Sequence, residues 1–104
     1  MFMRLMVMFD LPVNKKKLRK EYSKFRRFLL NDGYDMMQYS IYSRICNGLD
    51  NVDKHMSRLQ EHVPKKGCVR AMIVTERQFE SIAILVGTVS PQEKRVKTQQ
   101  LSIF

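Results

Sequence analysis

The hydrophobic pattern begins with a nearly continuous apolar segment, residues 2–9, which only Arg4 interrupts. A strand with one solvated face would alternate apolar and polar residues, so this run predicts a strand covered on both faces. Asn14 is the expected N-cap of a helix that runs to about Asp32. Gly33 then stands where a glycine commonly follows the helix C-terminus.

The predicted helix has two distinct faces. At ~100° per residue, four apolar side chains share an arc of about 60°: Leu18, Tyr22, Phe25 and Leu29. Four basic side chains lie on the opposite side within about 80°, and they are called the cationic stripe below: Lys16, Lys20, Lys24 and Arg27. The helix therefore has one packing face and one charged face.

Residues 34–45 return to a period of two, which is typical of a strand. Twelve residues are long for a single strand, so we expect a bend or bulge near residues 38–40, where the segment would divide into two strands. Asn47-Gly48 signals a turn.

A second helix is predicted from apolar residues at i, i+4, i+7 and i+11, namely Val52, Met56, Leu59 and Val63. Pro64 ends this helix. Residues 68–75 are predicted as a third strand and residues 82–86 as a fourth, which Gly87 closes.

The resulting order of elements predicts an α+β sandwich in which two helices cover one face of a mostly antiparallel sheet. The ferredoxin-like β-α-β-β-α-β arrangement is the closest named topology. We expect residues 1–87 to form this domain and residues 88–104 to form a polar tail. Its apolar end, residues 101–104, is predicted to add a strand to the sheet of a partner protomer.

The net charge of the chain is more informative about its partners than its length is. The 104 residues form one domain, and a formal net charge of +9 favours a polyanionic partner, above all nucleic acid. The apolar runs are too short to span a membrane, and the N-terminus has no secretory signal. Cys46 and Cys68 lack metal-site spacing and are predicted to be reduced thiols, so we expect a cytoplasmic protein.

Asp10 ends the first predicted strand. A carboxylate at a strand end can bind a hard cation such as Mg²⁺, which uses one or two carboxylates and keeps several waters. Such an ion would activate water and neutralise charge on a scissile phosphate. The alternative is structural, because an aspartate between a strand and a helix often caps or stabilises the helix.

The cationic stripe also has two interpretations. It is either a solvated helix face or a surface that binds phosphates. Like charges four residues apart repel, and Glu21 is the only acid in this helix, so the pattern favours phosphate binding. Further basic candidates, on faces that the sequence does not fix, are Arg19, Arg26, Lys65, Lys66 and Arg77.

Other candidate residues receive structural interpretations. His55 and His62 are seven residues apart, too far for one metal ion, and are predicted to be solvated. Tyr34 is either a core residue or a base-stacking residue. The remaining aromatic candidates are predicted to pack in the core or in a dimer interface: Tyr39, Tyr42, Phe25 and Phe28.

Several segments also occur together in one known family. They are FDLP at 9–12, a basic helix closing at Gly33, QYSIY at 38–42, PKKG at 64–67 and TERQF at 75–79. Over residues 1–87 the chain resembles the small CRISPR adaptation proteins of the Cas2 family, most closely those of type II systems.

This resemblance implies a ferredoxin-like homodimer in which strand-terminal segments cross between protomers. In the family, the dimer bridges two dimers of the adaptation integrase and holds duplex DNA for insertion as a spacer. Many members are described as Mg²⁺-dependent endonucleases of RNA or DNA, which would make Asp10 the catalytic metal ligand, facing its copy across the dimer axis. Many members also carry a second acid shortly afterwards, whereas residues 11–14 contain none.

The sequence therefore favours two functions. The first is a scaffold that holds prespacer DNA for the integrase, and the alternative is primarily a metal-dependent endonuclease that uses paired Asp10 residues. A third option is a basic RNA-binding module unrelated to CRISPR, which predicts neither an integrase partner nor exchange of the tail.

Overall fold

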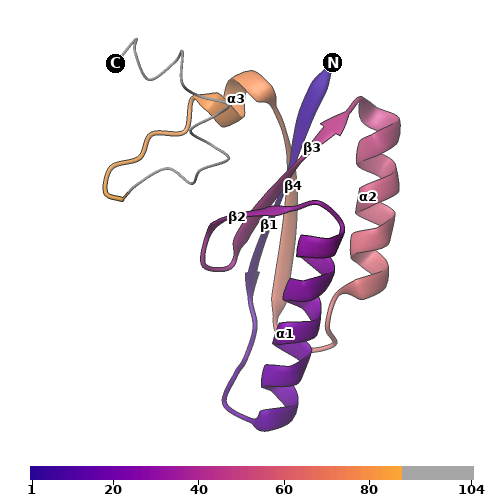
Figure 1. Ribbon diagram of the computed structural model, residues 1–104, viewed down its shortest axis with the longest axis vertical. Coiled ribbons are helices and arrows are strands. Elements are labelled where there is room, and N and C mark those ends of the chain that lie inside the picture. The colour runs from indigo at the N-terminus through magenta and orange to yellow at the C-terminus, as the bar shows by residue number, and fades with distance from the viewer. Residues whose placement is uncertain (88–104) are drawn as a thin grey trace.

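The computed structural model describes residues 1–87, which form a four-stranded antiparallel sheet with two long helices on one face (Figure 1). The strands lie in the order β2-β3-β1-β4. The α+β class and the ferredoxin-like order of elements are thereby confirmed. Along the chain, the elements are β1 (Phe2–Asp10), α1 (Lys16–Asn31), β2 (Asp35–Gln38), β3 (Ile41–Asn47), α2 (Leu49–His62), β4 (Cys68–Thr75) and α3 (Glu76–Glu80).

The core lies between the sheet and the two long helices. Alternate residues of a strand share a face, and Leu5, Val7 and Phe9 of β1 are buried in the core cluster. Phe9 meets Phe25 edge-on with ring centroids 5.2 Å apart and stacks on Tyr42 at 5.7 Å. Each large apolar side chain buried in this way contributes roughly 1.5–3 kcal/mol. The helices contribute Phe25, Leu29, Val52 and Leu59 to the same cluster.

The other face of β1 is also largely covered, as its sequence predicts. Arg4 is 5% exposed and Met6 is 7% exposed. The two predicted cysteine thiols are free, and they lie far apart because Cys46 pairs with Met3 near the start of β1 whereas Cys68 pairs with Asp10 at its end.

The two ends of α1 differ from one another in how well the sequence predicts them. Asn14 is not the N-cap: Lys15 occupies that position, without a side-chain cap, because Asn14 lies one residue too far from the first turn. At the other end Gly33 has φ of +90°, and its N–H donates to the Leu30 carbonyl. The glycine predicted after the C-terminus is therefore confirmed.

Residues 34–45 do not form one long strand. They form a hairpin, in which β2 and β3 pair antiparallel around Tyr39 and Ser40, with a register shift between Met36 and Gln38. Ser40 has φ of +67°, the left-handed conformation that tight turns require. The predicted break near residues 38–40 is confirmed, and the chain reverses there.

The predicted fourth strand at residues 82–86 is wrong. Thr75 and Gln78 form a capping box, with Gln78 N–H to Thr75 Oγ1 at 3.0 Å and Thr75 N–H to Gln78 Oε1 at 2.9 Å. This box starts α3 and ends the extended chain. After α3, residues 82–86 pair with no strand of the described part of the chain, and Leu85 and Val86 are 90% and 95% exposed. The predicted tail, residues 88–104, with its C-terminal strand, lies outside the described residues.

Candidate nucleic-acid interface

Asp10 is the exposed last residue of β1 and pairs with Cys68, the first residue of β4. The helix-capping interpretation is wrong, because α1 begins only at Lys16 and has no side-chain cap. Asp10 forms no ion pair with the other residues of the described part of the chain, so its carboxylate is free to bind a ligand.

The turn before β4 packs directly against Asp10. Gly67 has φ of +98°, and a Cβ atom on it would lie 2.7 Å from the Asp10 carbonyl oxygen. Only glycine allows this close approach without strain. The approach brings Lys65 and Lys66, which immediately precede Gly67, to the same end of the sheet as Asp10.

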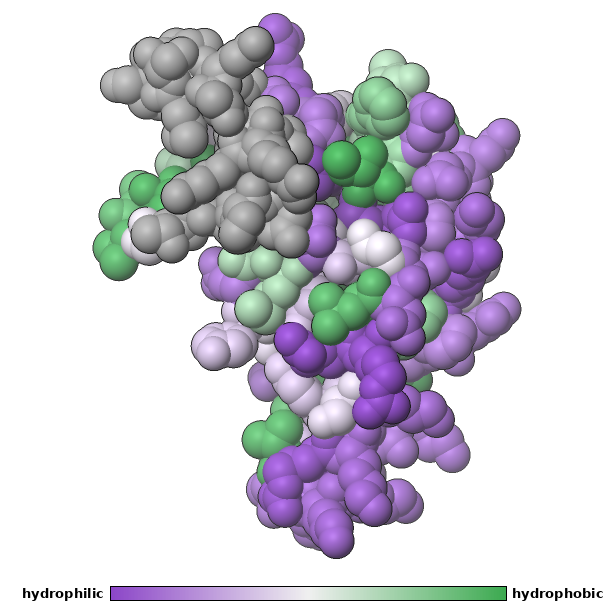
Figure 2. Space-filling model, viewed as in Figure 1, coloured by the Kyte–Doolittle hydropathy of each residue, from purple (hydrophilic) through white to green (hydrophobic). Residues whose placement is uncertain are grey.

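The cationic stripe is exposed along α1, and none of its four residues forms an ion pair within the described part of the chain. From Lys16 to Arg27 the stripe extends roughly 16 Å at about 1.5 Å per residue. Arg19 and Arg26 are exposed too, and Arg19 Nη1 donates to the Val13 carbonyl at 3.0 Å. Figure 2 shows hydrophilic side chains gathered along the margin where Figure 1 places α1 and α2.

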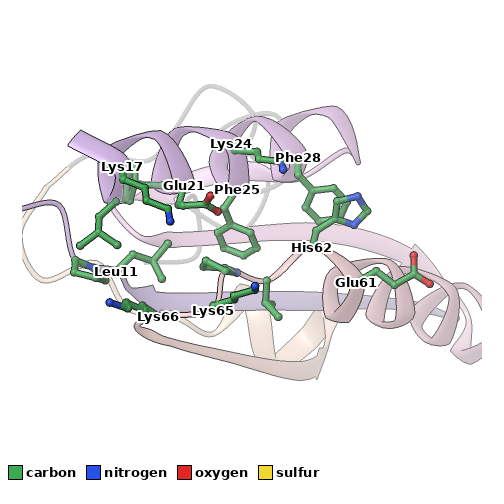
Figure 3. A pocket seen from close by; sticks show the side chains of 15 residues that line it. Leu11, Lys17, Glu21, Lys24, Phe25, Phe28, Glu61, His62, Lys65 and Lys66 are labelled. Carbon is green, nitrogen blue, oxygen red and sulfur yellow. The ribbon is translucent and has the colours of Figure 1, made fainter. Parts of the chain in front are cut away.

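Among the other basic candidates, Lys65 and Lys66 lie near α1, whereas Arg77 lies at the opposite end of the sheet. Lys65 and Lys66 lie across a groove from Lys17 and Lys24 (Figure 3). Arg77 follows the far end of β4, where Thr75 pairs with Met3. That end is roughly 23 Å from Asp10 along the sheet, at about 3.3 Å per residue.

The oxygen chemistry of Asp10 suits a hard divalent cation, but one chain offers few ligands. No group of three or more His, Cys, Asp or Glu side chains within residues 1–87 could hold a metal ion. Magnesium uses one or two carboxylates and keeps several waters. If Asp10 binds such an ion, a second carboxylate could come from another copy of Asp10 in a dimer.

A charged cluster around the buried side chains of Asp32 and His55 lies away from this surface and was not predicted from the sequence. His55 is only 3% exposed, so its predicted solvation is wrong. Its Nδ1 lies 2.8 Å from Asp32 Oδ2, and Arg58 Nη1 donates to Asp32 Oδ1 at 2.9 Å. Arg44 Nη1 donates to the Asp32 carbonyl. The cluster ties the end of α1 to α2 and β3, and its role is structural.

The sequence did contain a signal for this cluster. His55 follows Val52 by three residues and precedes Leu59 by four, so it lies on the apolar face of α2. A histidine on that face is expected to be buried and therefore to need a polar partner.

Electrostatics in the cluster favour an ionised Asp32. Burial alone would raise the pKa of Asp32, but its hydrogen bonds and electrostatic interactions with His55 and Arg58 outweigh burial and lower the pKa. Burial raises the pKa of the neighbouring Tyr34 hydroxyl and of the Cys46 thiol. Tyr34 is therefore a core residue and not a base-stacking one, whereas Tyr39 is 85% exposed at the hairpin tip.

Arg4 is the second buried charge that the sequence analysis left without a partner. Its Nε donates to Glu76 Oε1 at 2.8 Å, and its guanidinium lies 4.2 Å from the centroid of the Phe79 ring. Both partners are in or at the start of α3 and lie more than seventy residues away in sequence. The contact fixes α3 against β1.

These features define a small, strongly basic α+β protein of the ferredoxin-like class, with a free carboxylate at the end of its first strand. No helix within residues 1–87 is long and apolar enough to cross a membrane.

Comparison with known proteins gives the family. The sequence profile of the family described as "CRISPR associated protein Cas2" matches residues 3–82. A protein of Acidovorax ebreus named "CRISPR-associated endoribonuclease Cas2" is 54% identical over 98% of this chain and 100% of its own length. Proteins with the same name from Parvibaculum lavamentivorans and Campylobacter jejuni are 44% and 41% identical, over 100% and 72% of their own lengths. The chain belongs to the Cas2 family of CRISPR-associated proteins.

Proposed function

We propose that this protein acts in CRISPR adaptation as a homodimer that holds prespacer duplex DNA by its phosphate backbone for an integrase. The observation that carries the proposal is the cationic stripe, which is exposed and without ion pairs within residues 1–87. Basic side chains of this kind position a duplex without reading its sequence, which suits a protein that handles DNA of any sequence. Membership of the Cas2 family supports the CRISPR context.

The sheet face opposite α1 and α2 supports the homodimer. Register places Ile45 beside Arg4 and Val74, and Met72 beside Met6. Neither α1 nor α2 covers this face, on which Ile45 and Met72 are 42% and 46% exposed. Apolar side chains exposed on one face of a sheet are typical of an interface. A second copy packed here would bury them.

The second candidate function is metal-dependent endonuclease activity. The names of the relatives, which call those proteins endoribonucleases, favour it, and so does the free Asp10 carboxylate. Two Asp10 side chains brought together across a dimer axis would hold Mg²⁺, which would activate a water for attack on a phosphodiester.

Spacer acquisition in cells tests the first function against the second. We compare Asp10→Asn with a variant in which all four stripe residues are changed to Gln. The scaffold function predicts loss of acquisition in the stripe variant and its retention in Asp10→Asn. Retention in the stripe variant would contradict the proposal.

Cleavage of single-stranded RNA by the purified protein tests the second function. We expect cleavage to require Mg²⁺, to stop with a chelator and to fall at least a hundredfold in Asp10→Asn, which keeps the shape of the side chain but removes its charge. Cleavage at the wild-type rate in this variant would exclude Asp10 from the reaction.

A further inference from the structure

A groove of about 510 Å³ opens between α1 and the segment that joins α2 to β4 (Figure 3). Leu11 lies at one end of the groove, and the rings of Phe28 and His62 lie at the other. Phe25 projects into it from α1, and Tyr22 contributes to the lining. Aromatic rings therefore form part of a mainly apolar lining. The volume of the groove lies in the range of sites that bind small molecules.

The aromatic end of the groove is held in place by α2. Phe28 and His62 are stacked, with ring centroids 4.0 Å apart and an interplanar angle of 8°. His62 Nδ1 lies 2.7 Å from the Arg58 carbonyl oxygen, to which it donates. This hydrogen bond fixes the imidazole ring, so the aromatic wall is formed before any ligand binds.

The rim of the groove is cationic on both sides. Lys17 and Lys24 come from α1, and Lys65 and Lys66 come from the loop opposite (Figure 3). These four lysines form no ion pairs within residues 1–87. Two acids, Glu21 and Glu61, also line the groove, which leaves an excess of positive charge.

This combination favours a ligand with a flat aromatic part and a phosphate. A nucleobase gains stacking energy on aromatic side chains regardless of its identity, and lysines bind the adjoining phosphates. A base paired within a duplex cannot enter the groove, because its faces and edge are already occupied. An apolar peptide would gain nothing from four lysines at the rim.

The groove is continuous with the cationic stripe, because Lys24 belongs to both. A strand whose phosphates lie on the stripe would therefore reach the groove without a break. Asp10 is not among the residues that line the groove, although Leu11 is, so the groove adjoins the proposed metal site without including its carboxylate.

We propose that this groove binds one unpaired nucleotide of a bound strand, with the base against the half-buried Tyr22 and Phe28 and the phosphate between the lysines. The proposal rests on the proposed function, since it assumes that the stripe holds the adjoining strand. It adds a second mode of contact, in which the protein recognises an unpaired end.

Fluorescence anisotropy with three 20-base-pair duplexes tests the proposal. One duplex is blunt, one carries a four-nucleotide thymidine overhang, and one carries an overhang of four abasic nucleotides with the same phosphates. We expect the thymidine overhang to bind roughly tenfold more tightly than the abasic one, as a stacked base would. Phe28→Leu should remove this difference and leave the blunt duplex unaffected, while Phe2→Leu, at the exposed start of β1, should change neither.

Equal affinity of the wild-type protein for the two overhangs, together with salt-dependent binding of the blunt duplex, would overturn this inference alone. Absence of binding to all three duplexes would overturn the proposed function and this inference with it. Photo-cross-linking of the wild-type protein to an overhang containing 5-iodouracil gives a readout that does not depend on the folding of a variant. Adducts should fall on Tyr22 or Phe28, and adducts confined to other residues would overturn the assignment.

Discussion

At the scale of single residues, the structure separates basic side chains that are committed to the fold from those that are free. Arg4, Arg44 and Arg58 are bound to carboxylates or carbonyl groups. The stripe residues have no ion pairs within residues 1–87. Net charge alone therefore overstates the surface available to phosphates, and the free side chains on α1 are the ones that matter.

Asp32→Asn tests the buried cluster. At pH 7 we expect the free energy of unfolding to fall by about 1–3 kcal/mol, because His55 and Arg58 lose an ionised partner. The folded-state pKa of Asp32 is below its ordinary value of 3.8, so its contribution to stability is complete above that pH. It is lost as pH falls through the lower, folded-state pKa. Urea titrations from pH 7 to pH 2 should show the difference between variant and wild type shrinking below pH 4, and a difference independent of pH would contradict the cluster's role.

At the scale of elements, periodicity predicted most of the fold. The two faces of α1 and the bounds of β4 follow directly from the residue pattern, because burial and exposure repeat at the period of each element. The prediction of a strand at residues 82–86 was wrong, because an apolar run indicates burial but does not identify the element against which it packs. The contacts of Arg4 with Glu76 and of Asp32 with His55 could not be predicted either, since they join residues that are distant in sequence.

The candidate site was predictable only in part. Asp10 at a strand end and the stripe on one helix face could be placed by local pattern alone. The approach of Gly67 to Asp10, which brings Lys65 and Lys66 to the same end, depends on the pairing of β1 with β4. No local pattern indicates that approach or the groove beside α1.

The sheet face opposite α1 and α2 leads to a prediction about dimer formation. Met72→Glu places a charge in the proposed interface, where burial would cost several kcal/mol. We expect the dimer dissociation constant to rise at least tenfold in analytical ultracentrifugation. Gln60→Glu adds the same charge on the exposed side of α2 and should leave the dimer intact, whereas an unchanged dimer in Met72→Glu would exclude this face.

At the scale of the whole molecule, the proposed binding of duplex DNA depends on how charge is distributed over the surface of the domain. One face of the sheet is covered by helices, and the outer side of α1 carries free cations that continue to the Lys65–Lys66 loop. In a dimer, two such surfaces would lie on one body and would span a longer stretch of duplex than either alone. Binding should then be strongly dependent on salt and indifferent to sequence.

The most direct test is the salt dependence of the affinity for blunt duplex DNA. For each phosphate contact removed, the slope of log affinity against log salt should lose about 0.9. We expect Lys20→Gln to lower both the affinity and the magnitude of the slope. The variant in which all four stripe residues are changed to Gln should lower both further than Lys20→Gln does. Lys54→Gln, an equally exposed lysine on α2, should leave both unchanged. If the four-residue variant bound duplex DNA with the wild-type affinity and slope, α1 would not be the surface that holds the phosphate backbone.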